Sequence, residues 1–88
     1  MTSELEQLDR EHELCKLSHA LSDEAMTLAK TPSQFEVRRG WVARALWTHQ
    51  EMVNFIAFRP ANPTDEAMMG ATNQFKKLIN MLRVKWNI

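Results

Sequence analysis

The stretch QFEVRRGWVARALWTHQEMVNFIAF, residues 34–58, decides the fold of this 88-residue chain. It contains no proline and many residues that favour helices, so it predicts a helix. Its apolar residues recur on several sides of that helix instead of along one stripe. A helix that packs on one core has one apolar face, whereas a helix that is apolar nearly all round is buried on several sides. The sequence therefore predicts a helical protein that binds itself or a partner.

Composition and length indicate an all-α protein with a single domain over residues 1–88. The chain is 44% hydrophobic and 25% charged, as globular domains are. Glycine and proline are scarce, tyrosine is absent, and the helix formers Met, Leu, Ala, Glu, Lys and Gln are plentiful. A chain of this length has room for one hydrophobic core.

Capping signals divide the chain into three helices. Thr31, Pro32 and Gln34 combine a cap, a first-turn proline and a capping box, and Ser3 begins a similar capping box near the N-terminus. Two prolines soon after residue 58 prevent the middle helix from continuing. The predicted helices cover about 3–30, 32–58 and 63–86.

Short connections between these helices predict an antiparallel three-helix bundle. Folding the chain about Thr31 places Leu21 near Trp41. The same fold brings together Asp23, Glu24, Arg38 and Arg39. We expect the helices to continue through Gly40 and Gly70, where the small residue permits a neighbouring helix to approach closely.

The charge is balanced overall but unevenly distributed. Residues 1–31 contain three basic and seven acidic residues, and residues 32–88 contain eight basic and four acidic residues. Either the acidic first helix lies against basic helices, or a basic face contacts an acidic partner. That face would contain Arg38, Arg39, Lys76, Lys77, Arg83 and Lys85. A net charge of zero argues against a dedicated nucleic-acid binder, so nucleic-acid binding through these residues is the alternative function.

Two neighbouring helices can cover only part of the middle helix. They account for one stripe that runs from Phe35 to Ala57 and for another from Val37 to Phe55, which leaves Trp47 and Phe58 on a third side. The first helix also has a second, semi-polar stripe. We therefore expect a homodimer or partner interface formed by Trp41, Trp47, Phe55, Phe58, Leu5, Leu8, His12, Cys15, His19 and Met26.

The sequence does not indicate a catalytic centre, a metal site or a cofactor. His12, Cys15 and His19 share one side of a helix and are zinc-ligand types. The two histidines lie about 10.5 Å apart along that helix, however, which is too far for easy sharing of one ion. A single cysteine excludes an internal disulfide, and the acidic N-terminus does not resemble a signal peptide, so we expect a cytoplasmic protein with no membrane span.

Arg44 and His49 have the spacing Arg-x-x-x-x-His, which is similar to the ribonuclease motif of the HEPN helical domains. The resemblance covers these two residues only. It implies RNA cleavage by Arg44 and His49 as a third, remote function.

The expected function is that of a small, non-enzymatic regulator, adaptor or inhibitor that binds another protein. Compact helical chains of this size are typical of phage and mobile-element proteins that block a host machine, such as anti-CRISPR proteins and anti-transcription factors. The phage or mobile-element role is a background expectation. The expectation that the chain binds another protein follows from the surplus of apolar surface, since aromatic clusters that stay exposed mark contact sites.

Overall fold

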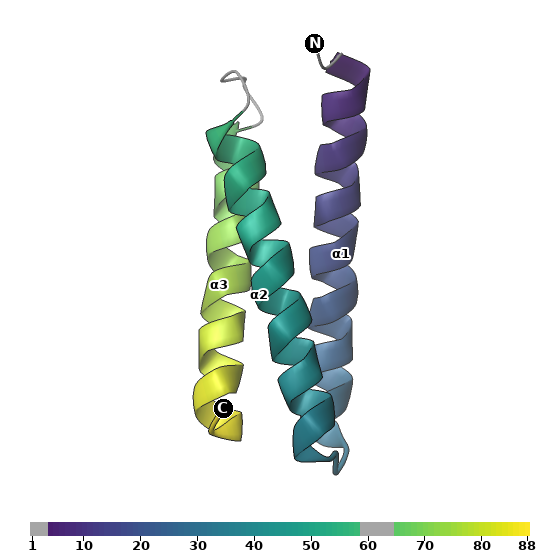
Figure 1. Cartoon of the computed structure of the whole chain (residues 1–88), viewed down its shortest axis with the longest axis vertical. Coiled ribbons are helices and arrows are strands. Elements are labelled where there is room, and N and C mark those ends of the chain that lie inside the picture. The colour runs from purple at the N-terminus through teal and green to yellow at the C-terminus, as the bar shows by residue number, and fades with distance from the viewer. Residues whose placement is uncertain (1–3, 59–64) are drawn as a thin grey trace.

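The computed structural model describes residues 4–58 and 65–88, and every regular element in these ranges is an α-helix. The helices are α1 (Glu4–Lys30), α2 (Phe35–Ala57) and α3 (Asp65–Trp86). They pack side by side in a body of 45 × 18 × 17 Å (Figure 1). α2 contacts both other helices extensively, whereas α1 and α3 contact each other much less. The predicted all-α fold with three packed helices is confirmed.

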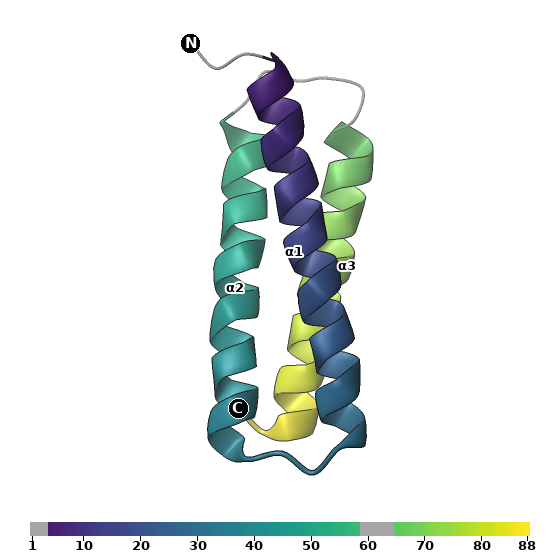
Figure 2. The same ribbon diagram turned by 90° about the vertical axis from the view of Figure 1, so that its right-hand side faces the viewer.

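Ion pairs between α1 and α2 fix which parts of these helices lie together. Arg10 contacts Glu51 with an N–O distance of 3.1 Å, and Glu24 pairs with Arg44. The expected pairing of Glu24 with Arg38 or Arg39 is therefore wrong. The Arg38 guanidinium lies instead over the ring of Trp86, 5.5 Å from its centre. Figure 2 shows that the 31–34 connection and the C-terminus lie at the same end of the molecule.

The start of α2 differs from the prediction because Thr31 serves the preceding helix. Its amide and its hydroxyl both donate to the carbonyl oxygen of Thr27, so Thr31 closes α1 and is not a cap for α2. Gln34 is the N-cap residue of α2, and its side chain makes no capping hydrogen bond. α2 ends at Ala57, one residue from the predicted end. The predicted cap at Ser3 and the predicted start of the third helix at 63 lie outside the described residues.

Both glycines lie inside continuous helices, as expected, but they do not allow a close helix contact. A Cβ atom built on Gly40 or Gly70 meets no atom of a neighbouring residue within 4 Å. Both residues are exposed, so they lie on outward sides of α2 and α3. The expectation of a close approach at these glycines is wrong.

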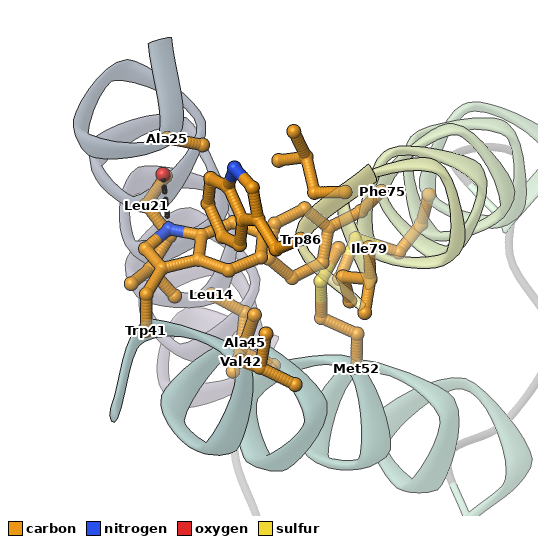
Figure 3. Close-up of a cluster of buried hydrophobic side chains, with 12 residues drawn as sticks. Leu14, Leu21, Ala25, Trp41, Val42, Ala45, Met52, Phe75, Ile79 and Trp86 are labelled. Atoms are coloured by element: carbon orange, nitrogen blue, oxygen red, sulfur yellow. Dashed lines mark hydrogen bonds between the residues drawn. The ribbon is translucent and has the colours of Figure 1, made fainter. Parts of the chain in front are cut away.

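Trp41 lies at the centre of the core and connects all three helices (Figure 3). Its indole Nε1 donates a 2.7 Å hydrogen bond to the carbonyl oxygen of Leu21 on α1, which confirms that Leu21 lies near Trp41. Its ring meets the ring of Trp86 on α3 edge to face, with centres 5.5 Å apart. The other buried apolar residues are Leu14, Leu21, Ala25, Val42, Ala45, Met52, Met68, Phe75, Ile79 and Leu82.

Candidate protein-binding surfaces

The residues expected at an interface do not all lie on the surface. Trp41 is fully buried and Phe55 is half-buried against the core, so both are already covered by this chain's own helices. Trp47 is 56% exposed and Phe58 is 86% exposed. On α1, the exposed members of the expected interface are Leu5, Leu8, His12, His19 and Met26, whereas Cys15 is half-buried.

Trp47 lies on the side of α2 that adjoins α1. Trp47 lines a shallow hollow with Leu17 and Ala20 of α1. Phe58 follows eleven residues later, about three helical turns, and therefore lies on roughly the same side. We call Trp47, Phe58, Leu17 and Ala20 the Trp47 edge. The charged groups next to this edge are paired within the chain, since Arg44 binds Glu24 and Arg10 binds Glu51.

A second apolar surface lies on another outer side of α2, about 100° around the helix from Trp47. The sequence predicted that a neighbouring helix covers the stripe from Phe35 to Ala57, and this is wrong except at Val42. Phe35 is 52% exposed, and Leu46 and Val53 are also exposed. α1 and α3 both pack against the broad side of α2 that carries Trp41, Ala45 and Met52. The stripe therefore remains outside the core.

Polar and basic side chains of α3 border this stripe. Along one side of α3, the exposed residues Met69, Asn73, Lys76, Asn80 and Arg83 follow at intervals of three and four. Met69 and Asn73 line a hollow together with Val53 of α2, which places the start of this row beside the stripe. We call the stripe (Phe35, Leu46, Val53, Ala57) and this row of α3 together the α2–α3 face.

His49 locates Lys76 on the same face. Partial burial lowers the pKa of the His49 imidazole below its ordinary value, and the nearby Lys76 ammonium lowers that pKa further. Lys76 must therefore lie close to α2. Within the described part of the chain, neither Lys76 nor Arg83 forms an ion pair. The α2–α3 face thus combines an apolar stripe with unpaired positive charge.

The six basic residues expected to contact an acidic partner do not form one patch. Lys76 and Arg83 are seven residues apart and share a side of α3, while Lys77 lies about 100° around the helix from Lys76. Lys85 lies about 160° around α3 from Arg83, on the same helical geometry. Arg39 is exposed near the start of α2, whereas Arg38 stacks on Trp86.

Cys15 takes part in the packing of α1 against α3. Its thiol donates a 3.7 Å hydrogen bond to the Met68 sulfur, and burial, with a smaller contribution from Glu11, raises the pKa of the thiol. Within residues 4–58 and 65–88, no three side chains of His, Cys, Asp or Glu come together as a metal ion would require. Cys15 is therefore a packing residue whose thiol stays protonated near neutral pH.

Arg44 and His49, which resemble a ribonuclease motif, point in different directions. Five residues along a helix correspond to a rotation of about 140° between two side chains. Arg44 bonds to Glu24 on α1, whereas His49 lies near Lys76 on α3. The two side chains do not converge on one site within this chain.

Comparisons of the chain with protein families, with curated proteins and with solved structures find no match. Among the described helices, none has both the length and the apolar character that crossing a membrane requires. The candidate surfaces are thus defined by the exposure and the charge of this chain's own residues.

The sequence pattern identified the apolar stripe of α2 but did not predict that this stripe is exposed. The pattern predicts that a neighbouring helix covers Leu46 and Val53. The available signal was the narrow apolar stripe of α3 itself, which can cover only one side of α2. That stripe is occupied by contacts with the side of α2 that carries Trp41 and Met52.

Proposed function

We propose that this chain is a non-enzymatic, antiparallel three-helix protein that acts as a regulator, adaptor or inhibitor by binding other protein surfaces. One observation supports the proposal above others. After packing against both neighbours, α2 keeps large apolar side chains exposed on its two outer sides, among them Phe35, Leu46, Trp47 and Phe58. Exposure of such a side chain costs about 1.5–3 kcal/mol relative to full burial. A partner that covers these side chains would therefore form a more stable complex.

The Trp47 edge is the surface that best suits a second copy of the chain. A symmetric dimer places the same patch of both subunits in contact, and the patch must therefore complement itself. The charges that border Trp47 and Phe58 are paired internally, so two such edges meet without unpaired like charges. Tryptophan at the centre of a contact is also a frequent binding hot spot.

Site-specific photo-cross-linking in the source cell tests the proposal. A photoreactive phenylalanine analogue replaces Leu46 in one variant and Trp47 in another, and the cells are irradiated before lysis. We expect a discrete adduct with another protein from position 46, and an adduct of twice the chain mass from position 47. Both positions are exposed and apolar, and neither lies in the core.

Met81 supplies the matched control, because it is 59% exposed and lies about 140° around α3 from Lys76, away from both surfaces. The analogue at position 81 should give no discrete adduct. If positions 81, 46 and 47 give the same products, or none of them gives an adduct, the chain does not use these surfaces and the proposed function is overturned.

A further inference from the structure

We propose that the α2–α3 face receives an acidic amphipathic helix of a partner protein. This inference rests on the proposed function and names the kind of partner that one of its two surfaces recognises. A helix that docks in this way inserts apolar side chains spaced three and four residues apart. The α2 stripe offers matching apolar positions at Phe35, Leu46 and Val53, all of them exposed.

The size of the face fits one helix. Phe35 and Val53 are 18 residues apart, which corresponds to about 27 Å along α2, or five turns of a partner helix. At one end of the stripe, a hollow lined by Val53, Ile56, Ala57 and Met69 can accept a large apolar side chain. Toward the other end, Asn80 and Arg83 line a second, more polar hollow with Val84 of α3 and with Asn87 and Ile88, which follow α3.

The sign of the partner's charge follows from the row of α3. Lys76 and Arg83 are exposed on the side that faces the stripe, and neither has an ion-pair partner among the described residues. Arg39 is exposed near one end of the same stripe. The stripe and the row contain no acidic residue. Carboxylates on the flank of a docked helix would therefore meet three cations that have no ion-pair partner among the described residues, and Asn73 and Asn80 can donate additional hydrogen bonds.

The same charges disfavour a second copy of this face as the occupant. Two α2–α3 faces in contact would bring the cations of one copy (Lys76, Arg83 and Arg39) against the cations of the other, and juxtaposed like charges weaken association. The face therefore differs from the Trp47 edge, where the neighbouring charges are already paired. The two outer sides of α2 thus suit different partners.

Binding of two synthetic helical peptides to the full chain tests the proposal. Both are fluorescein-labelled peptides of about 21 residues with leucine at heptad positions a and d, and the flanking positions carry glutamate in one and lysine in the other. We expect saturable anisotropy for the glutamate peptide and none for the lysine peptide. The double variant Lys76→Glu, Arg83→Glu should weaken binding of the glutamate peptide at least about tenfold.

The matched control is Lys77→Glu with Lys85→Glu, which changes the same number of charges elsewhere on α3 and should alter affinity less than about twofold. The variant Leu46→Asn, Val53→Asn should also lose binding, because the stripe supplies the apolar contact. Failure of the glutamate peptide to saturate, equal binding of the lysine peptide, or equal loss in the control overturns the proposal.

Two further results separate this proposal from related ones. A DNA duplex that is retained by the wild-type chain, lost on Lys76→Glu with Arg83→Glu, and unaffected by Leu46→Asn would reassign the face to phosphate binding and overturn the proposal. A discrete cross-link from position 46 without binding of the glutamate peptide would leave the protein-binding function standing and overturn only the acidic helix.

Discussion

The two buried tryptophans differ in whether their indole N–H group has a hydrogen-bond acceptor. Substitution by phenylalanine should therefore lower the free energy of unfolding by different amounts at the two positions. Trp41 Nε1 donates to the Leu21 carbonyl oxygen, whereas Trp86 Nε1 is buried without a partner among the described residues. Trp41→Phe should cost about 2 kcal/mol, since it removes a hydrogen bond and leaves a small void. Trp86→Phe should cost less than about 1 kcal/mol, because it also removes a buried unsatisfied donor.

Urea unfolding followed by circular dichroism measures both free energies of unfolding. The exposed Trp47 is the control, because Trp47→Phe should change stability by less than about 0.5 kcal/mol in the monomer. A loss for Trp86→Phe that equals or exceeds that for Trp41→Phe would show that the Trp41 hydrogen bond is not a main support of the core.

His49 predicts a specific pH dependence of stability. Burial and Lys76 lower the pKa of the folded imidazole below its ordinary value of 6.5. The unfolded chain therefore binds more protons in the window just below pH 6.5, so the stability that neutral His49 allows is lost as the pH falls through that window. His49→Gln should reduce the loss of stability between neutral and mildly acidic pH.

The measurement is the urea midpoint of wild type and His49→Gln at several pH values across this window. The exposed Gln50 provides the control substitution Gln50→Asn, which removes no titratable group and should retain the wild-type pH profile. Identical profiles for wild type and His49→Gln would contradict the assigned position of Lys76 beside the imidazole.

At the scale of helices, Gly40 should be replaceable with a gain in stability. The position is inside α2, its added Cβ meets nothing within 4 Å, and it has no positive φ. Gly40→Ala should therefore stabilise the chain by about 0.5–1 kcal/mol through helix propensity alone. The exposed Ala43 gives the reverse control, since Ala43→Gly should cost a similar amount in urea unfolding. Destabilisation by Gly40→Ala would mean that another helix packs closely there.

The first turns of α1 should open more readily than the rest of that helix. No described side chain from Leu5 to Glu13 is buried, and the buried residues of α1 begin at Leu14. Stability to local opening follows buried contacts, so amides before residue 14 should exchange at least about tenfold faster than those around Leu21. Amide hydrogen exchange measured by NMR checks this, and uniform protection along α1 would contradict it.

The presence of the helices and the packing of α1 against α2 could be predicted, because the apolar periodicity of the sequence agrees with the packing of the core. The apolar periodicity of 34–58 is strong enough to override the cost of Gly40, and folding at Thr31 places Leu21 beside Trp41 as observed. The start of α2 was not predictable from its capping pattern. The Thr31 hydroxyl can either donate to a carbonyl oxygen at the end of α1 or accept from an amide at the start of α2, and in the structure it donates to the Thr27 carbonyl oxygen.

The candidate surfaces were only half predictable. The exposure of Trp47 and Phe58 followed from counting stripes on one helix. The exposure of Leu46 and Val53 did not, because it depends on the angle at which α1 and α3 approach α2. Periodicity gives the sides of a helix that are apolar, whereas only the arrangement of its neighbours decides which of those sides remain uncovered.

For the molecule as a whole, the Trp47 edge predicts the state of the chain in solution. Sedimentation equilibrium should give a mass of twice the 10.3 kDa of one chain at micromolar concentration, because covering Trp47 and Phe58 removes two large exposed side chains per subunit from water. Trp47→Ala with Phe58→Ala should give a monomer with unchanged helicity. Val84→Ala, at an 83% exposed position on α3, should leave the dimer intact.

The charge pattern makes this test more informative, because the two outer sides of α2 should respond differently to salt. Pairing at the Trp47 edge is apolar and should persist as ionic strength rises, whereas contacts that use Lys76 and Arg83 should weaken. A mass that rises toward the dimer only when salt is added would place the α2–α3 face, whose like charges salt screens, and not the Trp47 edge, at the contact between copies. A monomer at every concentration would leave Trp47 and Phe58 open to a foreign protein instead.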